Sequence, residues 1–403
     1  MSGDTVVIVG ASHASVQAID TLRREGHQGH IVLVGDEPYL PYNRPPLSKK
    51  YLSGEMERER LLLRSVQFYE QAHVETKLGL RVTAIDRTDQ RLRLSDGDEL
   101  HYDKLLLCIG SRPRLLEVPG YDLPGIHYLR TIADVDAIRA DMAAAHNLVV
   151  VGAGYIGLEA AASARHLGLD VTVVEMADRP MNRVVAPEIS TFYLRRHEHE
   201  GVRILCNTSV TAFSGSERVH SVHCGDRELA ADLVIVGVGI LPESTLAASA
   251  GLRCENGIWV DEHCQTSDPS IYAAGDCTYH PSVRYGRRVR LESVDNAVEQ
   301  ARTAAANICG KTARHEHVPW FWSDQYDVKL QIAGLTQGYD QTVIRGDPDS
   351  GRFALYYLAN GELLAVDAVN STKDFMNGKK WIAEHKRPDP ALLADATVDL
   401  KSI

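Results

Sequence analysis

The residues best suited to chemistry form a glycine-rich turn at positions 152–157. It reads Gly152-Ala153-Gly154-Tyr155-Ile156-Gly157 and lies between an apolar run at 148–151 and a helical pattern that continues to residue 167. The first glycine permits a tight turn, the second lets backbone amides approach a pyrophosphate, and the third lets helix and strand pack closely. The phosphates of a dinucleotide would lie at the positive end of the helix. The turn predicts a dinucleotide site, and the alternative is a purely structural glycine turn.

An acidic residue follows this turn at the distance a ribose requires. Glu175 lies 23 residues after Gly152, at the end of an apolar run at 171–174. A carboxylate in that place binds both ribose hydroxyls and repels a 2′-phosphate. The spacing therefore favours NADH over NADPH.

An imperfect copy of the same plan begins the chain. An apolar run at 6–9 leads into Gly10-Ala11-Ser12-His13-Ala14-Ser15, with serine where the second and third glycines would stand. Serine is small and its hydroxyl can donate to a phosphate, but the Cβ of Ser12 must be accommodated. Asp36 or Glu37, 26 or 27 residues after Gly10, supplies the ribose acid. Taken alone, this segment is either a dinucleotide site or a plain strand-to-helix turn.

A third element, at 266–276, decides between these two interpretations. It ends in an apolar strand followed by Gly275 and Asp276, the form of the second FAD fingerprint, in which the aspartate accepts from a ribitol hydroxyl. A lone Gly-Asp pair is usually a turn. With two Rossmann turns in this order, it predicts FAD at the first turn and NADH at the second.

The elements that must position these residues form two βαβ units. Strands are predicted at 6–9 and 31–34 in the first unit and at 148–151 and 171–174 in the second. Further apolar strands at 105–109 and 233–236 would close the units, and from 319 onward short strands at 329–332, 341–344 and 353–358 indicate a separate α+β domain. The fold class is α/β. Three domains are predicted: an FAD domain at 1–112 and 238–318, an NADH domain at 113–237, and a C-terminal domain at 319–403.

Composition excludes several classes of protein. A net charge of −11 over 403 residues argues against a nucleic-acid partner. The seven dispersed cysteines encode neither a zinc site nor an iron–sulfur cluster, so no metal is expected, and they fit a reducing cytoplasm. No membrane span or signal peptide is found, so the expectation is a soluble, full-length cytoplasmic chain without a membrane partner. Residues 37–60 hold no cysteine, so a bound flavin would have to pass electrons directly to an external acceptor.

Several stretches resemble one known family. The chain is similar to the FAD-dependent, NADH-dependent ferredoxin reductases of bacterial oxygenase systems at 44–49, 152–159, 265–276, 290–294 and 319–325. The resemblance implies a glutathione-reductase-like fold with two Rossmann-type domains and a C-terminal domain. It also implies that electrons pass from NADH through FAD to a two-iron two-sulfur ferredoxin. That ferredoxin would supply a haem-thiolate monooxygenase or an aromatic-ring dioxygenase.

The resemblance also assigns individual residues. It implies that Arg44, Pro45, Arg130, Ser293 and Val294 contact FAD, that Gly239 contacts NADH, and that Lys49 lies beside the flavin ring. A cation there would favour the anionic reduced flavin. Glu159 would reach back to pair with Lys49 and orient the nicotinamide. The alternatives are a solvated Lys49 and a Glu159 that merely favours the positive first turn of its helix.

Aromatic and basic residues predict the surface for the ferredoxin. Trp320 and Trp322 are either ordinary core or, as the resemblance implies for one of them, Trp322 first, neighbours of the flavin and the partner. Two basic clusters could steer an acidic ferredoxin: Arg284, Arg287, Arg288 and Arg290, and Lys379, Lys380, Lys386 and Arg387. The alternative is that both clusters are solvated faces.

Other functions of the same fold stay open at this point. One is a rubredoxin or monodehydroascorbate reductase. Another, of a different class, is a flavin-bound interaction protein resembling apoptosis-inducing factor, in which NADH binding drives association rather than turnover.

Overall fold

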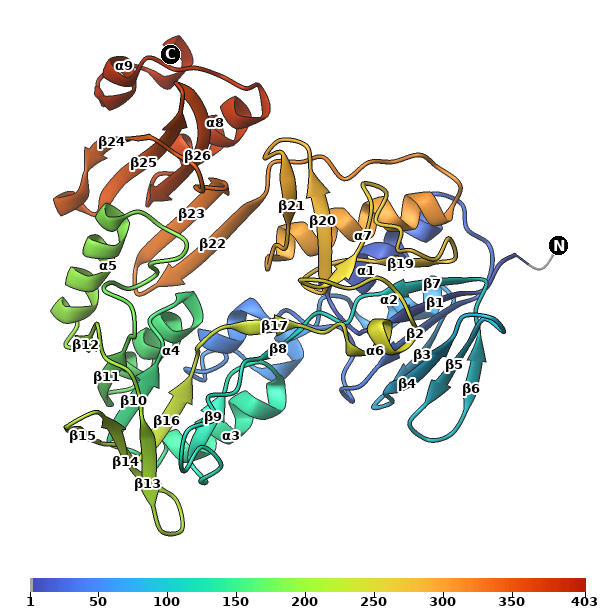
Figure 1. The fold of residues 1–403 in the computed structure, drawn as a ribbon, viewed down its shortest axis with the longest axis horizontal. Coiled ribbons are helices and arrows are strands. Elements are labelled where there is room, and N and C mark those ends of the chain that lie inside the picture. The colour runs from blue at the N-terminus through green and yellow to red at the C-terminus, as the bar shows by residue number, and fades with distance from the viewer. Residues whose placement is uncertain (1–2) are drawn as a thin grey trace. The chain divides into compact units, whose positions relative to one another are not determined.

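The computed structural model describes residues 3–403, whose contacts divide the chain into two compact units (Figure 1). The first unit comprises residues 3–43 with Arg58–Arg112 and Leu241–His317. The second comprises Arg44–Glu57, Pro113–Ile240 and Val318–Ile403. The short segment Arg44–Glu57 thus packs with the second unit, an association that its position in the sequence did not suggest. The three predicted domains remain a prediction.

A five-stranded parallel sheet organises the first unit. Its order is β19 (Ile271–Ala273), β7 (Lys104–Leu107), β1 (Val6–Val9), β2 (Ile31–Gly35) and β3 (Val74–Leu78). Strands buried on both faces read as continuous apolar runs, which explains why β1, β2 and β7 were recognisable in the sequence. The strand predicted at 105–109 ends at Leu107, two residues early.

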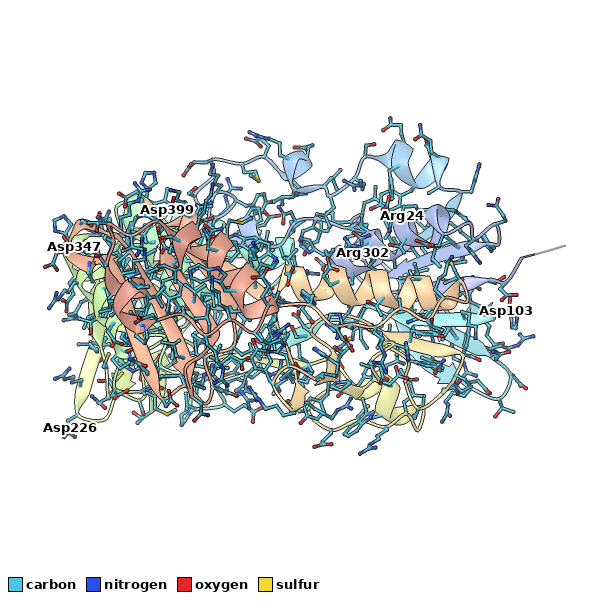
Figure 2. The ribbon with its side chains drawn as sticks, turned by 90° about the horizontal axis from the view of Figure 1, so that it is seen from above. Arg24, Asp103, Asp226, Arg302, Asp347 and Asp399 are labelled. Carbon is cyan, nitrogen blue, oxygen red and sulfur yellow. The ribbon has the colours of Figure 1, made fainter. Side chains whose placement is uncertain are left out.

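Different elements cover the two faces of this sheet. Helices α1 (His13–Arg24) and α7 (Val294–Ile308) pack together on one face through small and aliphatic residues. Arg24 of α1 and Arg302 of α7, both labelled in Figure 2, are exposed. The antiparallel strands β4 (Val82–Asp86), β5 (Arg91–Leu94) and β6 (Glu99–His101) pack on the other face. Because both carboxyl-end turns of β1 and β19 leave the same edge of the sheet, the two predicted FAD segments meet there.

The second unit contains another parallel sheet. Its order is β12 (Arg203–Leu205), β11 (Asp170–Val174), β10 (Asn147–Val151), β16 (Leu233–Val236) and β9 (Ile126–Tyr128). Helix α4 (Tyr155–His166) packs on β10 and β11, while α3 (Ile132–Met142) contacts β9 and α5 (Pro187–His199) contacts β12. A small antiparallel sheet of β13 (Ala212–Gly215), β14 (Val219–Cys224) and β15 (Arg227–Ala230) shares an apolar core with the parallel sheet.

The last part of the second unit is a five-stranded antiparallel sheet. Its order is β22 (Trp320–Gln325), β23 (Val328–Gly334), β26 (Glu362–Val369), β25 (Arg352–Ala359) and β24 (Gln341–Asp347). Helix α8 (Thr372–Ala383) packs on β26 and β23. The short strands predicted at 329–332, 341–344 and 353–358 are confirmed and are each longer than predicted. Among the helices of residues 3–403, none is long and apolar enough to cross a membrane.

Candidate functional site

The glycine turn of the second unit has the geometry of a dinucleotide cradle. Gly152 has a φ of +101°, and a Cβ added to it would lie 2.5 Å from the carbonyl oxygen of Gly237. A Cβ on Gly157 would lie 2.1 Å from the carbonyl oxygen of Gly152. A Cβ on Gly154, by contrast, would meet no atom within 4 Å. The outer glycines are therefore required by packing, and the middle one faces open space at the start of α4, where a pyrophosphate fits.

Glu175 ties the cradle to the end of β11. Its Oε2 accepts from the backbone N–H of Ala153 at 2.7 Å, and its Oε1 accepts from the N–H of Ala177 at 2.8 Å. Each carboxylate oxygen has a second lone pair for another donor. The acid is thus held beside the cradle, and its contact with a ribose remains a prediction.

Three other residues predicted to bind NADH are Ile156, Tyr155 and Gly239, and they differ in exposure and backbone conformation. The side chain of Ile156 is 46% exposed directly after Gly154 and Tyr155, unusual for an isoleucine in a first helical turn. The ring of Tyr155 packs 4.7 Å from that of Phe321, and burial raises the pKa of its hydroxyl. Gly239 has a φ of +105°, so its backbone conformation favours glycine.

The turn that begins at Gly10 in the first unit accommodates serine at positions 12 and 15, where glycine would be expected. Gly10 has a φ of +107°, and an added Cβ would lie 2.3 Å from the carbonyl oxygen of Cys108. The buried Ser15 accepts from the N–H of Ser12 and donates to the carbonyl of Ser12, both at 2.8 Å. The hydroxyl of Ser12, expected to donate to a phosphate, donates to Cys108 at 3.4 Å. Serine thus fits this turn because its hydroxyls are satisfied locally, and the Gly10 cradle fits a dinucleotide.

The neighbouring residues of this turn have separate partners. Nε2 of His13 lies 3.1 Å from Oδ1 of Asn43. Ala14 is 2% exposed and belongs to the core, so only its backbone can face a ligand. The side chain of Asp36 is 57% exposed and pairs with Arg81 at 3.4 Å, whereas Glu37 accepts from Tyr42 at 2.7 Å.

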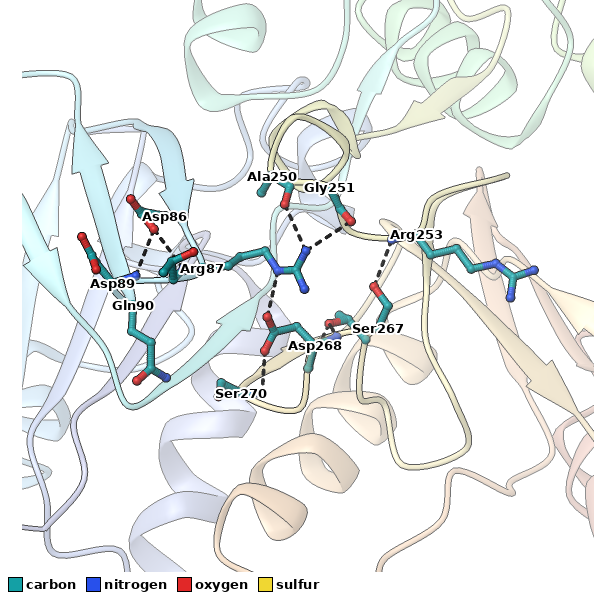
Figure 3. Close-up of polar contacts among 12 residues, drawn as sticks. Asp86, Arg87, Asp89, Gln90, Ala250, Gly251, Arg253, Ser267, Asp268 and Ser270 are labelled. Carbon is teal, nitrogen blue, oxygen red and sulfur yellow. Dashed lines mark hydrogen bonds and ion pairs between the residues drawn. The ribbon is translucent and has the colours of Figure 1, made fainter.

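The second FAD fingerprint is held in place by an ion pair. Arg87 contacts Asp268 at 2.8 Å and also donates to the carbonyls of Ala250 and Gly251, as Figure 3 shows. Asp268 in turn accepts from the N–H of Ser270 at 2.9 Å, just before β19. This network positions the strand that leads to the Gly-Asp pair.

At the end of that strand, the carboxylate of Asp276 accepts from the hydroxyl of Ser111 at 2.8 Å. The N–H of Gly275 donates to the buried Gln300 at 2.8 Å. Ser293 caps α7 by accepting from the N–H of Asn296 at 3.1 Å, and Val294 is the first residue of that helix. The first unit therefore brings together the two FAD fingerprints and the start of α7.

The second unit brings Lys49 and Glu159 together. Nζ of Lys49 lies 2.6 Å from Oε2 of Glu159, and their side chains are 18% and 2% exposed. The same carboxylate accepts from the hydroxyl of Ser48 at 2.5 Å and from that of Ser323 at 2.6 Å. A nearly buried carboxylate with one cation and two hydroxyl donors is fixed in both position and orientation.

The remaining residues predicted for FAD lie in the second unit with this pair. Nη1 of Arg44 donates to the carbonyl of Arg130 at 2.8 Å. Pro45 begins the short 3₁₀ helix η1 (Pro45–Ser48), and its carbonyl accepts from Nζ of Lys49 at 3.2 Å. The helix places Ser48 and Lys49 side by side on Glu159.

Ser48 and Ser323 were not assigned to the site from the sequence. They lie 111 and 164 residues from Glu159, and no spacing rule connects them. The only available signal was their position inside two of the stretches that resemble the family.

The aromatic run of β22 is divided between two sides of the strand. Trp320 and Trp322 stack with their ring centroids 5.3 Å apart, and Trp320 also packs against Phe375 of α8. Nζ of Lys379 lies 5.4 Å from the centre of the Trp320 ring. Two of the predicted features, a tryptophan and a lysine, therefore share one face of the second unit.

The basic clusters differ in availability. Lys380 and Arg387 are exposed, although Lys380 lies 3.8 Å from Glu384, and Lys386 stacks on Trp381 at 4.7 Å. In the first cluster Arg287 is exposed and Arg284 is half-buried.

Arg288, which the sequence grouped with the docking residues, has partners inside the first unit, and its role in docking stays a prediction. Its guanidinium lies 3.5 Å from the centre of the Trp259 ring and donates to the carbonyls of Val260 and Tyr279. Burial lowers the pKa of Arg288. One of its terminal nitrogens, Nη2, is thus used inside the first unit.

Comparisons with known proteins show the family of the chain. The model of the pyridine nucleotide-disulphide oxidoreductase family matches residues 4–301, and that of the reductase C-terminal family matches residues 320–403. Rhodocoxin reductase of Rhodococcus erythropolis is 45% identical over 98% of this chain and 93% of its own length. Putidaredoxin reductase of Pseudomonas putida is 45% identical over 100% of this chain and 97% of its own.

A solved structure gives the same picture. The crystal structure of the covalent complex of putidaredoxin reductase with putidaredoxin matches with a TM-score of 0.96 and 44% identity, covering 100% of this chain and 98% of that one. The glutathione-reductase-like α/β architecture predicted from the sequence is thereby confirmed.

Proposed function

Because the chain belongs to the pyridine nucleotide-disulphide oxidoreductase family, we propose that it is an NADH-dependent ferredoxin reductase that uses FAD. The single observation that carries the proposal is the presence of two dinucleotide cradles of different type. Gly152, Gly154 and Gly157 form one, and Gly10 with the Gly275–Asp276 strand end forms the other. When bound, FAD supplies the conversion of a two-electron hydride donor into a source of single electrons.

The residues of the chain bind and orient. The start of α4 receives the NADH pyrophosphate, and Glu175 selects against a 2′-phosphate. Lys49 and Glu159 form a fixed pair of opposite charges, which would orient a bound nicotinamide and place a cation near the flavin. None of these residues acts as a nucleophile.

The acceptor is a two-iron two-sulfur ferredoxin that supplies an oxygenase. A relative that this chain matches over 98% of its length is known in a covalent complex with putidaredoxin. No cysteine lies at 37–60, where a disulfide that takes electrons from the flavin would be expected, and the seven cysteines of the chain are free thiols, so the flavin passes its electrons to an external acceptor. Among residues 3–403 no cluster of side chains is suited to hold a metal ion. The free cysteines also favour a cytoplasmic location.

An anaerobic titration tests this function. The purified yellow protein is titrated with NADH and, separately, with NADPH, and candidate ferredoxins are then added. We expect one equivalent of NADH to bleach the flavin absorbance, NADPH to do so only at much higher concentration, and a ferredoxin to restore the colour. A flavin that NADH bleaches but that only rubredoxin, monodehydroascorbate or oxygen reoxidises would refute the ferredoxin assignment.

A further inference from the structure

A chain of hydrogen bonds runs from Glu159 towards the edge of the second unit. Ser323 donates to Oε1 of Glu159 at 2.6 Å, and Nε2 of Gln325 donates to the hydroxyl of Ser323 at 3.1 Å. Nε2 of His197 donates to Oε1 of Gln325 at 2.8 Å, and the hydroxyl of Tyr326 donates to Nδ1 of His197 at 3.0 Å. All four donors point in the same direction, towards the carboxylate.

The carboxylate at its end determines this direction. Ser323 has one hydroxyl proton and donates it to Glu159, so its oxygen accepts from the amide of Gln325. His197 must then be neutral with its proton on Nε2. Burial lowers the pKa of His197 to about 4, with Arg196 adding to the effect while Gln325 and Glu200 oppose it. Each member of the chain therefore has one consistent hydrogen-bonding role.

The turn at the far end of the chain is held in a strained conformation. Tyr326 has a φ of +57° at the turn between β22 and β23, where a residue with a Cβ is unfavourable. Its ring packs edge-on against His197 with centroids 5.1 Å apart, and the guanidinium of Arg196 lies 5.4 Å from its centre. These contacts present the Tyr326 hydroxyl to His197, which compensates for the strain.

Alternate residues of β22 serve different neighbours. Phe321 packs on Tyr155 of α4, Ser323 contacts Glu159 of the same helix, and Gln325 contacts His197 of α5. The intervening Trp322 stacks on Trp320 instead. One strand thus joins the aromatic face proposed for the partner to the charge pair proposed for the nicotinamide.

We infer that Ser323, Gln325 and His197 are positioning residues for the reduction of the flavin by NADH. They hold the Glu159 carboxylate in the orientation in which it pairs with Lys49, and they act only through it. The inference rests on the proposed function, in which this pair orients the nicotinamide. The chain holds rather than conducts protons, because the Gln325 amide donates from one atom and accepts at another.

Two substitutions of His197 separate the hydrogen bond from the packing. A glutamine places its amide nitrogen where Nε2 of histidine stands and keeps the donor to Gln325. An asparagine reaches only as far as Nδ1 and loses it. We expect His197→Asn to lower the limiting rate of flavin reduction in anaerobic stopped-flow by about tenfold, the usual loss for a hydrogen bond that supports a charge. The NADH dissociation constant should not change, and His197→Gln should remain within about twofold of wild type.

Ser323→Ala and Glu159→Gln complete the design. Ser323→Ala removes one oxygen from the chain and should slow reduction as much as His197→Asn does, which keeps the test available if a substitution at the buried His197 prevents folding. If Glu159→Gln is as fast as wild type, the proposed function of the charge pair is wrong. If Glu159→Gln is slow but Ser323→Ala and His197→Asn are as fast as wild type, the pair acts alone and the positioning inference is wrong.

A measurement without turnover checks the same inference. In ¹⁵N-histidine-labelled holoenzyme, the His197 resonances, identified by their loss in His197→Gln, should show a neutral ring protonated at Nε2 throughout pH 6 to 8. A ring protonated at Nδ1, or one that titrates in this range, would overturn the inference.

Discussion

Replacing Lys49 with methionine should destabilise the second unit more than replacing its partner Glu159 with glutamine. The reason lies in their burial: the side chain of Glu159 is 2% exposed, and that of Lys49 is 18% exposed. Without the lysine, a buried carboxylate keeps only the hydroxyls of Ser48 and Ser323. Removing the partner of a buried charge lowers the free energy of unfolding by about 3 kcal/mol, because the remaining charge is left buried without its counter-charge.

Replacing Glu159 instead leaves an unpaired Lys49, which costs less free energy because Lys49 is the more exposed of the two. In Glu159→Gln the Lys49 ammonium keeps the carbonyl of Pro45, 3.2 Å away, and reaches water. We expect a loss of about 1 kcal/mol, that of an ordinary hydrogen bond. The double variant should lose less free energy of unfolding than the two single variants together, because no buried charge remains in it. We expect a coupling energy between the two substitutions of at least about 1.5 kcal/mol.

Urea unfolding of the holoenzyme measures this cycle. Three of the four tryptophans, Trp320, Trp322 and Trp381, lie in the second unit, so intrinsic fluorescence reports chiefly on that unit. Lys50→Met is the matched control, since the neighbouring lysine is exposed, and should change stability by less than about 0.5 kcal/mol. Equal losses for the two single variants, or losses that add to within about 0.5 kcal/mol, would show that Glu159 does not depend on Lys49.

Four further outcomes are expected. Glu175→Gln should reduce the preference for NADH over NADPH in kcat/KM by about tenfold, because it removes the charge that repels a 2′-phosphate; an unchanged ratio would place the selectivity elsewhere. Burial raises the pKa of Asp367 to about 7, above that of an unfolded carboxyl, so the folded chain binds the extra proton and the free energy of unfolding falls as pH rises from about 4 to about 7. Asp367→Asn should remove the part of that fall that lies between pH 5 and pH 8, at most about 3 kcal/mol, in urea titrations at these two pH values, and a difference equal to that of wild type would contradict it. Trp322→Ala should slow reduction of ferredoxin more than reduction of ferricyanide, and equal losses would remove its role towards the partner. Charge reversal at Lys379 and Lys380 should raise the Michaelis constant for ferredoxin and weaken its dependence on salt, whereas an unchanged salt profile would count against docking there.

Local backbone chemistry made much of the fold predictable. Strands β1, β2, β10 and β16 are buried on both faces and therefore appear as continuous apolar runs. The roles of Gly152 and Gly157 follow from backbone atoms close in the chain or on the next strand, so the motif predicts them without knowledge of the rest. The Gly275–Asp276 strand end could be assigned to FAD from the sequence because it follows two Rossmann turns.

Contacts between distant side chains were beyond the sequence. The guanidinium of Arg288 counted as surface charge until its stacking on Trp259 was known, because a run of arginines does not reveal which one turns inward. The hydrogen bonds within the turn that accommodate Ser15 in place of glycine required the positions of its buried atoms.

By itself, the amino-acid sequence determined the two glycine turns, since each depends on backbone geometry within a few consecutive residues. It also predicted their order from the Gly275–Asp276 pair and the preference for NADH from the spacing of Glu175. Only the tertiary structure decided which groups surround the Glu159 carboxylate. Ser48, Ser323 and His197 come from separate parts of the chain. Packing of η1 and β22 on α4 brings Ser48 and Ser323 to the carboxylate, and Gln325 of β22 links them to His197 of α5. The physical reason is that a hydrogen bond between distant residues leaves no periodicity in sequence, whereas a turn does.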